Sequence, residues 1–231
     1  VGTTDTDFDA DLDMVHALPE EVAYLQETVS DYLPQGNWSE IHFTNAGVRA
    51  LVRDNRPNAN ESAVSRKHGI VLHTQSEGLE GMITVLGGKI TAYRDIAEEV
   101  SNLAGSFLSD TTEGKTATTP LPGGDTLNLQ SLKAEVGRAA KEYGLTQAQA
   151  DNLVFLYGTE AYAVLNRIEH DPSLAERLSP AYPDIKAQVA HAIEAEQAQT
   201  LNDFLLRRSL LTFTPDQGVQ AIPSLLEYMT T

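Results

Sequence analysis

Residues 84–99 read TVLGGKITAYRDIAEE and join two kinds of secondary structure at a pair of glycines. The β-branched, apolar residues before the glycines are typical of a strand, and the residues after Lys89 have the spacing of an amphipathic helix. At the junction, Gly87 and Gly88 permit backbone conformations and close approaches that other residues do not. The stretch therefore predicts a strand, a tight corner and a helix, and the functional question is what lies against the corner.

The residues on either side extend this pattern. Upstream, three runs rich in valine, isoleucine and threonine are separated by turn-forming stretches and predict strands within 41–52, 63–74 and 81–87. Downstream, apolar residues at helical spacing predict a helix that ends near Gly105. Its apolar face is formed by Ile90, Tyr93, Ile96, Ala97, Val100 and Leu103.

The rest of the chain divides at a segment without periodicity. Residues 106–126 are rich in serine, threonine, glycine and proline and predict a linker. Beyond it almost every run predicts a helix, including one long helix from Asp184 to about residue 213 and a last helix capped by Thr214.

At the other end of the chain, residues 1–9 read as the tail of a strand, and the following helix begins at Pro19. The predicted fold class is therefore α+β. We expect part of a mixed-sheet domain over 1–110, a linker over 111–126 and an all-helical C-terminal domain over 127–231.

Composition excludes several kinds of chemistry. The 231 residues contain no cysteine, so disulfides, thiolate metal sites and cysteine nucleophiles are ruled out. The net charge of -17 disfavours binding to nucleic acid or to anionic lipid by electrostatic attraction. No apolar run approaches the ~18 residues of a membrane-spanning helix, and no signal-peptide pattern opens the chain, so an intracellular protein or a piece of one is expected.

In so acidic a protein, basic residues within predicted strands are informative. Arg49 and Arg66 lie in such strands, and Lys89 follows the glycine pair. If the three converge, they form a site for an anion such as phosphate, since arginine offers forked donors and lysine a point charge. The alternative is that the arginines lie on the wet face of a sheet and that the glycines form only a tight turn.

Other catalytic signals are weak. His68 and His73 do not have the spacing of a helical metal-binding pair, and carboxylates do not gather beside them in the sequence, so no metal site is predicted. No nucleophile elbow and no glycine-rich nucleotide loop stands in the chain. We therefore assign no catalytic residue from the sequence.

Several strings together go further than these patterns. VGTTDTD, AGVRAL, SRKHGI, GMITVLGGKITAYRDIAEEV, TPLPGG, LYG and QTLNDFLLRRSLL occur in this order from one end of the chain to the other. In this order and spacing they resemble the C-terminal portion of FAD-dependent glycerol-3-phosphate dehydrogenases. The GGKITAYR core with the upstream GVR is the specific part of the resemblance.

The resemblance implies a flavoenzyme that oxidises sn-glycerol 3-phosphate to dihydroxyacetone phosphate and passes electrons to a quinone. It implies that Arg49, Arg66 and Lys89 bind the substrate. It also implies that the corner faces the flavin, with these residues in contact with FAD: Gly87, Gly88, Lys89, Ile90 and Thr91. The family's GVRPL and TTYR read GVRAL and TAYR here, with Ala50 and Ala92.

The family's upstream half, with its glycine-rich FAD loop, is not in this sequence, so a fragment inactive on its own is expected. The resemblance implies a cytoplasmic location at the membrane face, with peripheral membrane contact and either a homodimer or a partner subunit. Two other interpretations stay open at this stage. One is an oxidase of the same lineage that uses oxygen, and the other is a non-catalytic interaction module built on the helices from Asp184 onward.

Overall fold

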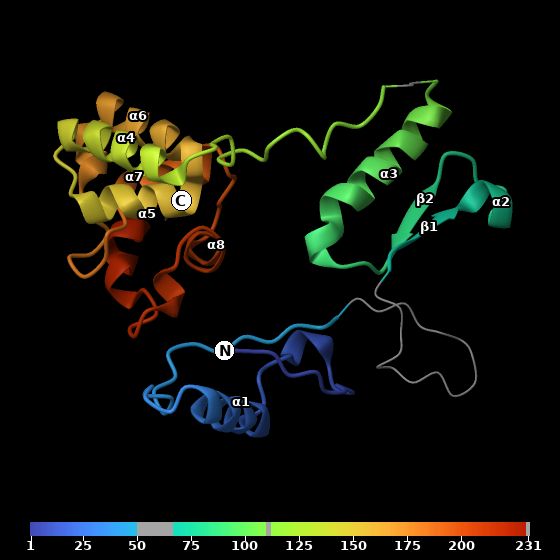
Figure 1. The fold of residues 1–231 in the computed structure, drawn as a ribbon, viewed down its shortest axis with the longest axis horizontal. Helices are drawn as coiled ribbons and strands as arrows, with labels where there is room; N and C mark the ends of the chain where they lie inside the picture. The colour runs from blue at the N-terminus through green and yellow to red at the C-terminus, as the bar shows by residue number, and fades with distance from the viewer. Residues whose placement is uncertain (50–66, 110–111, 230–231) are drawn as a thin grey trace. The chain divides into compact units, whose positions relative to one another are not determined.

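The computed structural model describes residues 1–49, 67–109 and 112–229. The chain forms two compact units, one made of residues 1–46 with 121–231 and the other of residues 47–120. Figure 1 shows the elements of each unit along the chain. The boundaries predicted at residues 110 and 126 stay predictions.

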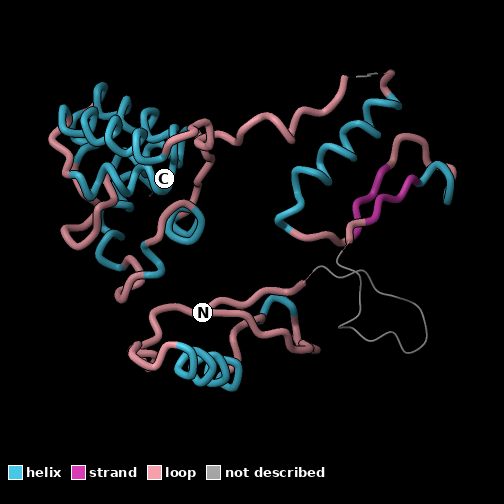
Figure 2. The backbone as a smooth tube through the Cα atoms, viewed as in Figure 1, coloured by secondary structure: helices cyan, strands magenta, loops and turns pink. Residues whose placement is uncertain are grey.

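The C-terminal part of the first unit is built of helices, with no strand among its described residues (Figure 2). It contains α4 (Leu129–Glu142), α5 (Gln147–Tyr157), α6 (Ala161–His170), α7 (Lys186–Glu194), α8 (Leu201–Arg207) and α9 (Ile222–Met229), with short 3-10 turns between them. The all-helical prediction for this region is confirmed.

These helices enclose the hydrophobic core. One cluster of buried side chains centres on α4, α5 and α6 and includes Val136, Leu153 and Leu165. A second cluster centres on α7, α8 and α9 and includes Phe204 and Leu225, both 0% exposed. Each helix presents one apolar face to this core, and the region therefore buries enough apolar surface to stabilise its own fold.

Two helix predictions in this region are wrong. The long helix expected from Asp184 is divided into α7 and α8, because the hydroxyl of Thr200 and the carboxylate of Asp203 form a capping box that starts a new helix. The last helix begins at Ile222, not at Thr214. The Thr214 hydroxyl instead donates to the carbonyl of Leu211.

The N-terminal part of the first unit contains a 3-10 turn, Leu12–Met14, and α1, Pro19–Tyr32. The predicted helix is confirmed, with Pro19 in its first turn. The Glu21 carboxylate accepts from the amide of Leu18 and from the hydroxyls of Thr4 and Thr6. No strand forms within 1–9 or within the described residues 41–49, so those two strand predictions are wrong as far as the structure describes them.

The second unit combines a small sheet and one long helix. Strands β1 (Gly69–Leu72) and β2 (Ile83–Leu86) pair antiparallel, with Gly69 opposite Leu86 and Leu72 opposite Ile83. A short helix, α2 (His73–Glu77), lies between them in the chain, and α3 (Tyr93–Phe107) follows. The strands predicted within 63–74 and 81–87 are thus present but shorter, and His73 starts a helix instead of continuing a strand.

The α+β expectation is confirmed in part. The described residues are mostly helical with a two-stranded sheet, and a larger mixed sheet is not seen among them. The corner helix begins with a 3-10 turn, Ile90–Ala92, before α3. Ile90 lies in this turn and not in α3, and it is 88% exposed; Tyr93 and Ala97 of the predicted apolar face are exposed as well.

Candidate functional site

The glycine pair forms a sharp corner after β2. Gly87 and Gly88 have φ angles of 64° and 97°, which side chains other than glycine rarely adopt. A Cβ on Gly88 would lie 2.9 Å from Cδ1 of Ile96 and 3.2 Å from Cβ of His68. The second glycine is therefore required for packing between the start of β1 and α3, which confirms the tight turn that the sequence suggested.

The residues directly after the glycines point outward. Lys89 and Thr91 are exposed, and Ile90 is 88% exposed. Within the described chain, no side chain caps the 3-10 turn or the first turn of α3. The positive end of this helix and an exposed lysine therefore lie beside an exposed apolar side chain, an arrangement that can accept a flat ligand carrying negative charge.

Two histidines flank β1, and His68 is the one that lies against the corner at Gly88. Nε2 of His68 lies 2.7 Å from Oε2 of Glu99 on α3, and Nε2 of His73 lies 2.8 Å from the Thr84 hydroxyl on β2. His73 also lies 3.2 Å from Glu77. The structure thus brings one carboxylate to each histidine, from α3 and from α2. Among the residues with described positions, no cluster that could hold a metal ion is found.

A second face of α3 holds part of the predicted linker. The Arg94 guanidinium donates to the carbonyl of Thr119 over 2.7 Å. The Glu98 carboxylate accepts from the amide of Thr116 over 2.9 Å and from its hydroxyl, and these bonds hold the pKa of Glu98 below its usual range. The stretch 116–119 is thus tied to the helix, which the lack of periodicity could not indicate.

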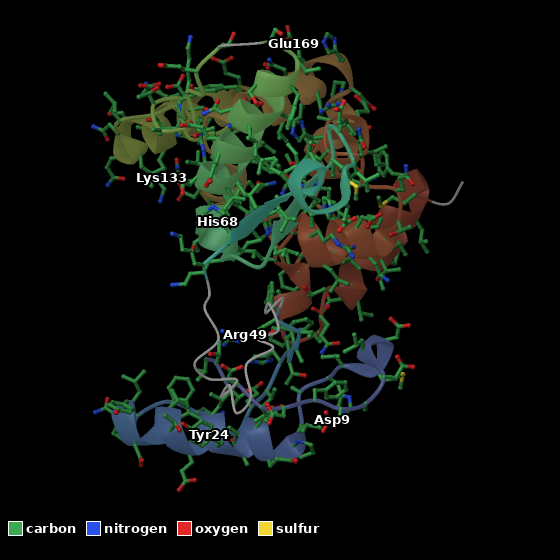
Figure 3. All side chains as sticks on the ribbon, turned by 90° about the vertical axis from the view of Figure 1, so that its right-hand side faces the viewer. Asp9, Tyr24, Arg49, His68, Lys133 and Glu169 are labelled. Atoms are coloured by element: carbon green, nitrogen blue, oxygen red, sulfur yellow. The ribbon has the colours of Figure 1, made fainter. Side chains whose placement is uncertain are left out.

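Of the two arginines predicted to join Lys89, the structure describes one. Arg49 is exposed and lies outside any helix or strand, near the end of the first described segment (Figure 3). Arg66 lies outside the described residues. The corner residues 87–91 are brought together by the chain itself, and the convergence of Arg49, Arg66 and Lys89 stays a prediction.

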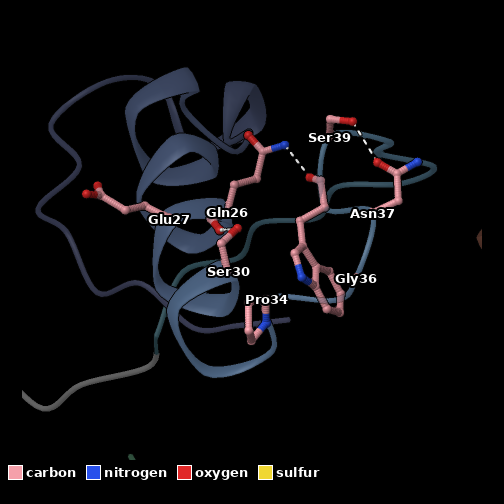
Figure 4. A pocket seen from close by; sticks show the side chains of 8 residues that line it. Gln26, Glu27, Ser30, Pro34, Gly36, Asn37 and Ser39 are labelled. Carbon is pink, nitrogen blue, oxygen red and sulfur yellow. Dashed lines mark hydrogen bonds between the residues drawn. The ribbon is translucent and has the colours of Figure 1, made fainter.

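A pocket of about 520 Å³ lies elsewhere, between the second half of α1 and the turn after it (Figure 4). Gln26 donates to the carbonyl of Trp38 over 2.6 Å, and the Trp38 indole donates to the carbonyl of Leu33 over 2.7 Å. The indole packs against Gly36, where a Cβ would have no room. None of the predicted site residues lines this pocket.

Two of the recognised strings meet in the helical region. Gly123 of TPLPGG accepts a backbone hydrogen bond from Thr159 over 2.9 Å, next to Gly158 of LYG. Both glycines have positive φ, and a Cβ on Gly158 would lie 1.9 Å from the Gly123 carbonyl oxygen. These strings therefore mark a backbone-to-backbone contact at the end of α5, which sequence reasoning left without a role.

The helical core also buries polar groups. The Asp184 carboxylate accepts from the side-chain amides of Asn152 and Gln188 over 3.3 Å each. Burial raises the pKa of this carboxyl. The His191 ring packs edge-on against Tyr157, and its Nδ1 accepts from Nε of Arg167 over 3.4 Å. Burial lowers the pKa of His191, because a charged imidazolium would lose its hydration there.

In the part of the chain that the structure describes, no helix is long and apolar enough to cross a bilayer.

Comparison with known proteins gives these features a context. A family model described as the C-terminal domain of alpha-glycerophosphate oxidase matches residues 114–231, just over half of the chain. The chain belongs to this family. The match covers the whole helical region and includes both Gly123 and Gly158.

Individual relatives also match the part of the chain before residue 114. A Synechocystis protein named glycerol-3-phosphate dehydrogenase is 33% identical over 236 residues, covering 100% of this chain and 41% of its own length. The aerobic glycerol-3-phosphate dehydrogenase of Bacillus subtilis is 31% identical over 220 residues, covering 90% of this chain and 38% of its own. The chain thus spans about two-fifths of the length of these relatives.

A solved structure shows the same fold. The glycerol-3-phosphate dehydrogenase from Bacillus halodurans, complexed with FAD, superposes with a TM-score of 0.74 at 24% identity, covering 99% of this chain and 44% of that one. The resemblance to the C-terminal portion of glycerol-3-phosphate dehydrogenases is confirmed by these relatives.

Proposed function

We propose that the chain is the C-terminal part of an FAD-dependent enzyme that oxidises glycerol 3-phosphate to dihydroxyacetone phosphate. The observation that carries the proposal is the match of the whole chain to a relative named glycerol-3-phosphate dehydrogenase. The FAD complex of the Bacillus halodurans protein, which has the same fold, supports the choice of cofactor.

The glycine corner fits a flavin. Its exposed side consists of Lys89, Ile90 and Thr91 in front of a helix start that no described side chain caps. Ile90 offers apolar contact to a flat ring, and the positive end of the helix dipole favours negative charge next to it. FAD, when bound, supplies the hydride acceptor. The corner's part is to hold the ring and stabilise negative charge on it.

The substrate's phosphate requires cations. Lys89 is exposed at the corner, and we propose that Arg49 and Arg66 join it to bind the phosphate. In a chain with a net charge of -17, three cations around one group would concentrate positive potential where the anionic substrate binds. Glycine has no side chain, so Gly87 and Gly88 would contact the flavin through their backbone. On its other side, Gly88 packs against Ile96 and His68.

The wider setting follows from the same family. We propose a quinone as the electron acceptor, a location at the cytoplasmic face of a membrane with peripheral contact, and assembly as a homodimer or with a partner subunit. This chain alone would be inactive, because the FAD pyrophosphate would bind in an upstream part such as the relatives contain. Residues 1–110 would complete the flavin and substrate region, with the domain after residue 126 acting as a helical cap.

The test mixes this chain with a separately expressed upstream part of the kind found in its relatives. We expect the mixture to retain FAD, seen in its absorbance, and to reduce a dye when glycerol 3-phosphate is added. Lys89→Ala should lower the rate at limiting substrate about tenfold or more, because a charged contact to phosphate is lost.

Lys141→Ala is the matched control, since Lys141 is an exposed lysine near the end of α4. Its rate should equal that of the unaltered chain. Equal losses in both variants would remove Lys89 from the site. Two folded, associated parts that retain no FAD and oxidise no glycerol 3-phosphate would overturn the proposed function, and oxygen uptake without added dye would replace the quinone with oxygen.

A further inference from the structure

The two histidines that flank β1 have matching surroundings but different places in the second unit. Each side chain is 14% exposed and lies beside one carboxylate, that of Glu99 on α3 for His68 and that of Glu77 on α2 for His73. The antiparallel ladder brings the start of β1 opposite the end of β2, where the glycine corner begins. His68 directly precedes β1 and therefore lies at the corner end of the ladder, whereas His73 follows β1 at the far end.

His68 lies against the corner with its Cβ and reaches α3 with its ring. A Cβ on Gly88 would lie 3.2 Å from Cβ of His68 and 3.8 Å from its Cα, so the glycine packs on the base of the histidine. At the tip of the ring, Nε2 donates to Oε2 of Glu99 over 2.7 Å. The other contact of Gly88 is Ile96, which lies within one turn of Glu99 on α3. The His68 side chain therefore joins strand to helix beside the residue that makes the corner.

Little else holds this corner in place. No residue between 67 and 109 whose exposure is described is fully buried, and a two-stranded sheet is marginally stable by itself. The turn that follows the glycines, Ile90–Ala92, has no side-chain cap. A corner that moves freely would have to be ordered each time a ligand binds, which weakens binding. A polar contact that fixes the corner beforehand therefore favours the ligand.

We propose that His68 is a positioning residue for the flavin. Its hydrogen bond to Glu99 holds the start of β1 against α3, which fixes Gly88 and with it the direction of the turn that would face the ring. His68 acts through the corner and does not touch the flavin, and His73 has no such role. The inference rests on the proposed function, because the proposed function places the flavin at this corner.

The effect of this contact on the corner is tested first in the chain itself, by amide hydrogen exchange. The amide of Ala92 donates to the carbonyl of Lys89 over 3.0 Å, so its protection reports on the turn after the glycines. His68→Ala removes the hydrogen bond to Glu99 but keeps the Cβ that packs on Gly88. We expect the protection of Ala92 to fall about fivefold, the effect of one hydrogen bond.

His73→Ala is the matched control, because it removes a histidine of equal exposure from the far end of the same strand. The backbone amide of residue 73 donates to the carbonyl of Met82 over 3.2 Å and reports on that end. In His68→Ala, protection should fall at Ala92 and not at this amide, and in His73→Ala the protection of Ala92 should be unchanged. Unchanged protection of Ala92 in His68→Ala, or an equal loss at both amides, would overturn the local effect.

Substitutions at Glu99 test whether the hydrogen bond is the cause. Glu99→Ala should lower the protection of Ala92 as much as His68→Ala does, and the double variant should lose no more than either alone, because both changes remove the same interaction. Glu99→Gln keeps a carbonyl oxygen that can accept from Nε2 of His68, so it should retain most of the protection. Losses that add in the double variant would contradict the role of this hydrogen bond.

The positioning role is tested in the mixture with the upstream part. His68→Ala should weaken the binding of FAD about fivefold and shift the absorbance of the bound flavin toward that of free FAD, with KM for glycerol 3-phosphate within a factor of about two. His73→Ala should change none of these. Lost protection at Ala92 with unchanged FAD binding and absorbance would overturn the positioning role.

The two levels of the inference fail in different ways. If the unaltered mixture retains no FAD, the proposed function is defeated and the positioning role with it. Hydrogen exchange in the chain alone would still decide whether the contact between His68 and Glu99 fixes the corner.

Discussion

The helical region, residues 127–229, and the described residues before 121 differ in how they bury their side chains. Every buried apolar residue of the described chain lies between Leu132 and Leu225, and none of the described residues before 121 is buried. Both regions contain amphipathic helices, yet only the helical region brings several of their apolar faces together. Amphipathic elements make a core only where enough of them meet.

The residues that stabilise the fold and the residues of the candidate site therefore lie in different parts of the chain. The glycine corner lies on a two-stranded sheet and one helix, and such a small assembly is marginally stable in water. Its exposed groups, including Lys89 and Ile90, are available to a ligand or to another part of a larger protein. The helical region makes its own core, and the turn over residues 211–218 is attached to it where the Tyr182 hydroxyl donates to Asp216.

The largest expected effect compares one core residue with one residue of α3. Phe204→Ala should lower the free energy of unfolding by about 4 kcal/mol, because it removes a fully buried ring and leaves a cavity. Leu103→Ala, at a half-buried position, should cost less than about 1.5 kcal/mol. Denaturant unfolding followed by circular dichroism measures both changes, and similar losses would contradict the idea that only the helical region has a core.

The next effect concerns the backbone contact between two glycines. Gly158→Ala should cost about 3 kcal/mol or more, because its Cβ would meet the Gly123 carbonyl oxygen at 1.9 Å. Gly144→Ala is the control: Gly144 has a φ of 74°, but no atom lies within 4 Å of its Cβ position. It should cost about 1 kcal/mol, from backbone strain alone. Thermal unfolding of the two variants in parallel distinguishes steric conflict from strain.

The smallest expected effect is a pH dependence of the helical region. Burial depresses the pKa of His191 in the folded state, so the unfolded chain takes up its proton first. Stability should therefore be fully present above the unfolded pKa of about 6.5 and decline as the pH falls from there toward the folded pKa. His191→Gln should flatten the decline between pH 7 and pH 5, measured as free energy of unfolding.

His170→Gln is the control for this measurement. His170 is exposed at the end of α6, and the same substitution there shows what loss of an exposed histidine does to the measurement. An identical decline in the His191 variant and the unaltered chain would show that other groups cause it.

Much of the helical region could be predicted from its sequence because local signals and packing agree there. The runs that follow the linker were predicted to be helices, and α4, α5 and α6 lie there. The division between α7 and α8 was not predicted, because helical spacing alone does not indicate it; the capping pattern of Thr200 and Asp203 is the local signal that does.

For the strands the agreement is weaker. Residues 41–49 have strand-like composition but no described strand, since β propensity mostly reflects the partners that a segment finds in the sheet. The candidate corner was predicted correctly as a strand, two glycines and a helix. The 3-10 turn that contains Ile90 was not predicted, since helical spacing of apolar residues does not distinguish such a turn from the first turn of an α-helix.

The sequence by itself determined the helical character of the C-terminal half, the glycine corner, the absence of cysteine chemistry and the family resemblance, because each depends on residue identity and local spacing. Only the tertiary structure decided that Gly88 packs between His68 and Ile96, that Gly123 meets Gly158, and that Gln217 reaches His42. These contacts join residues far apart in the chain, and no local pattern records a partner that folding alone brings near.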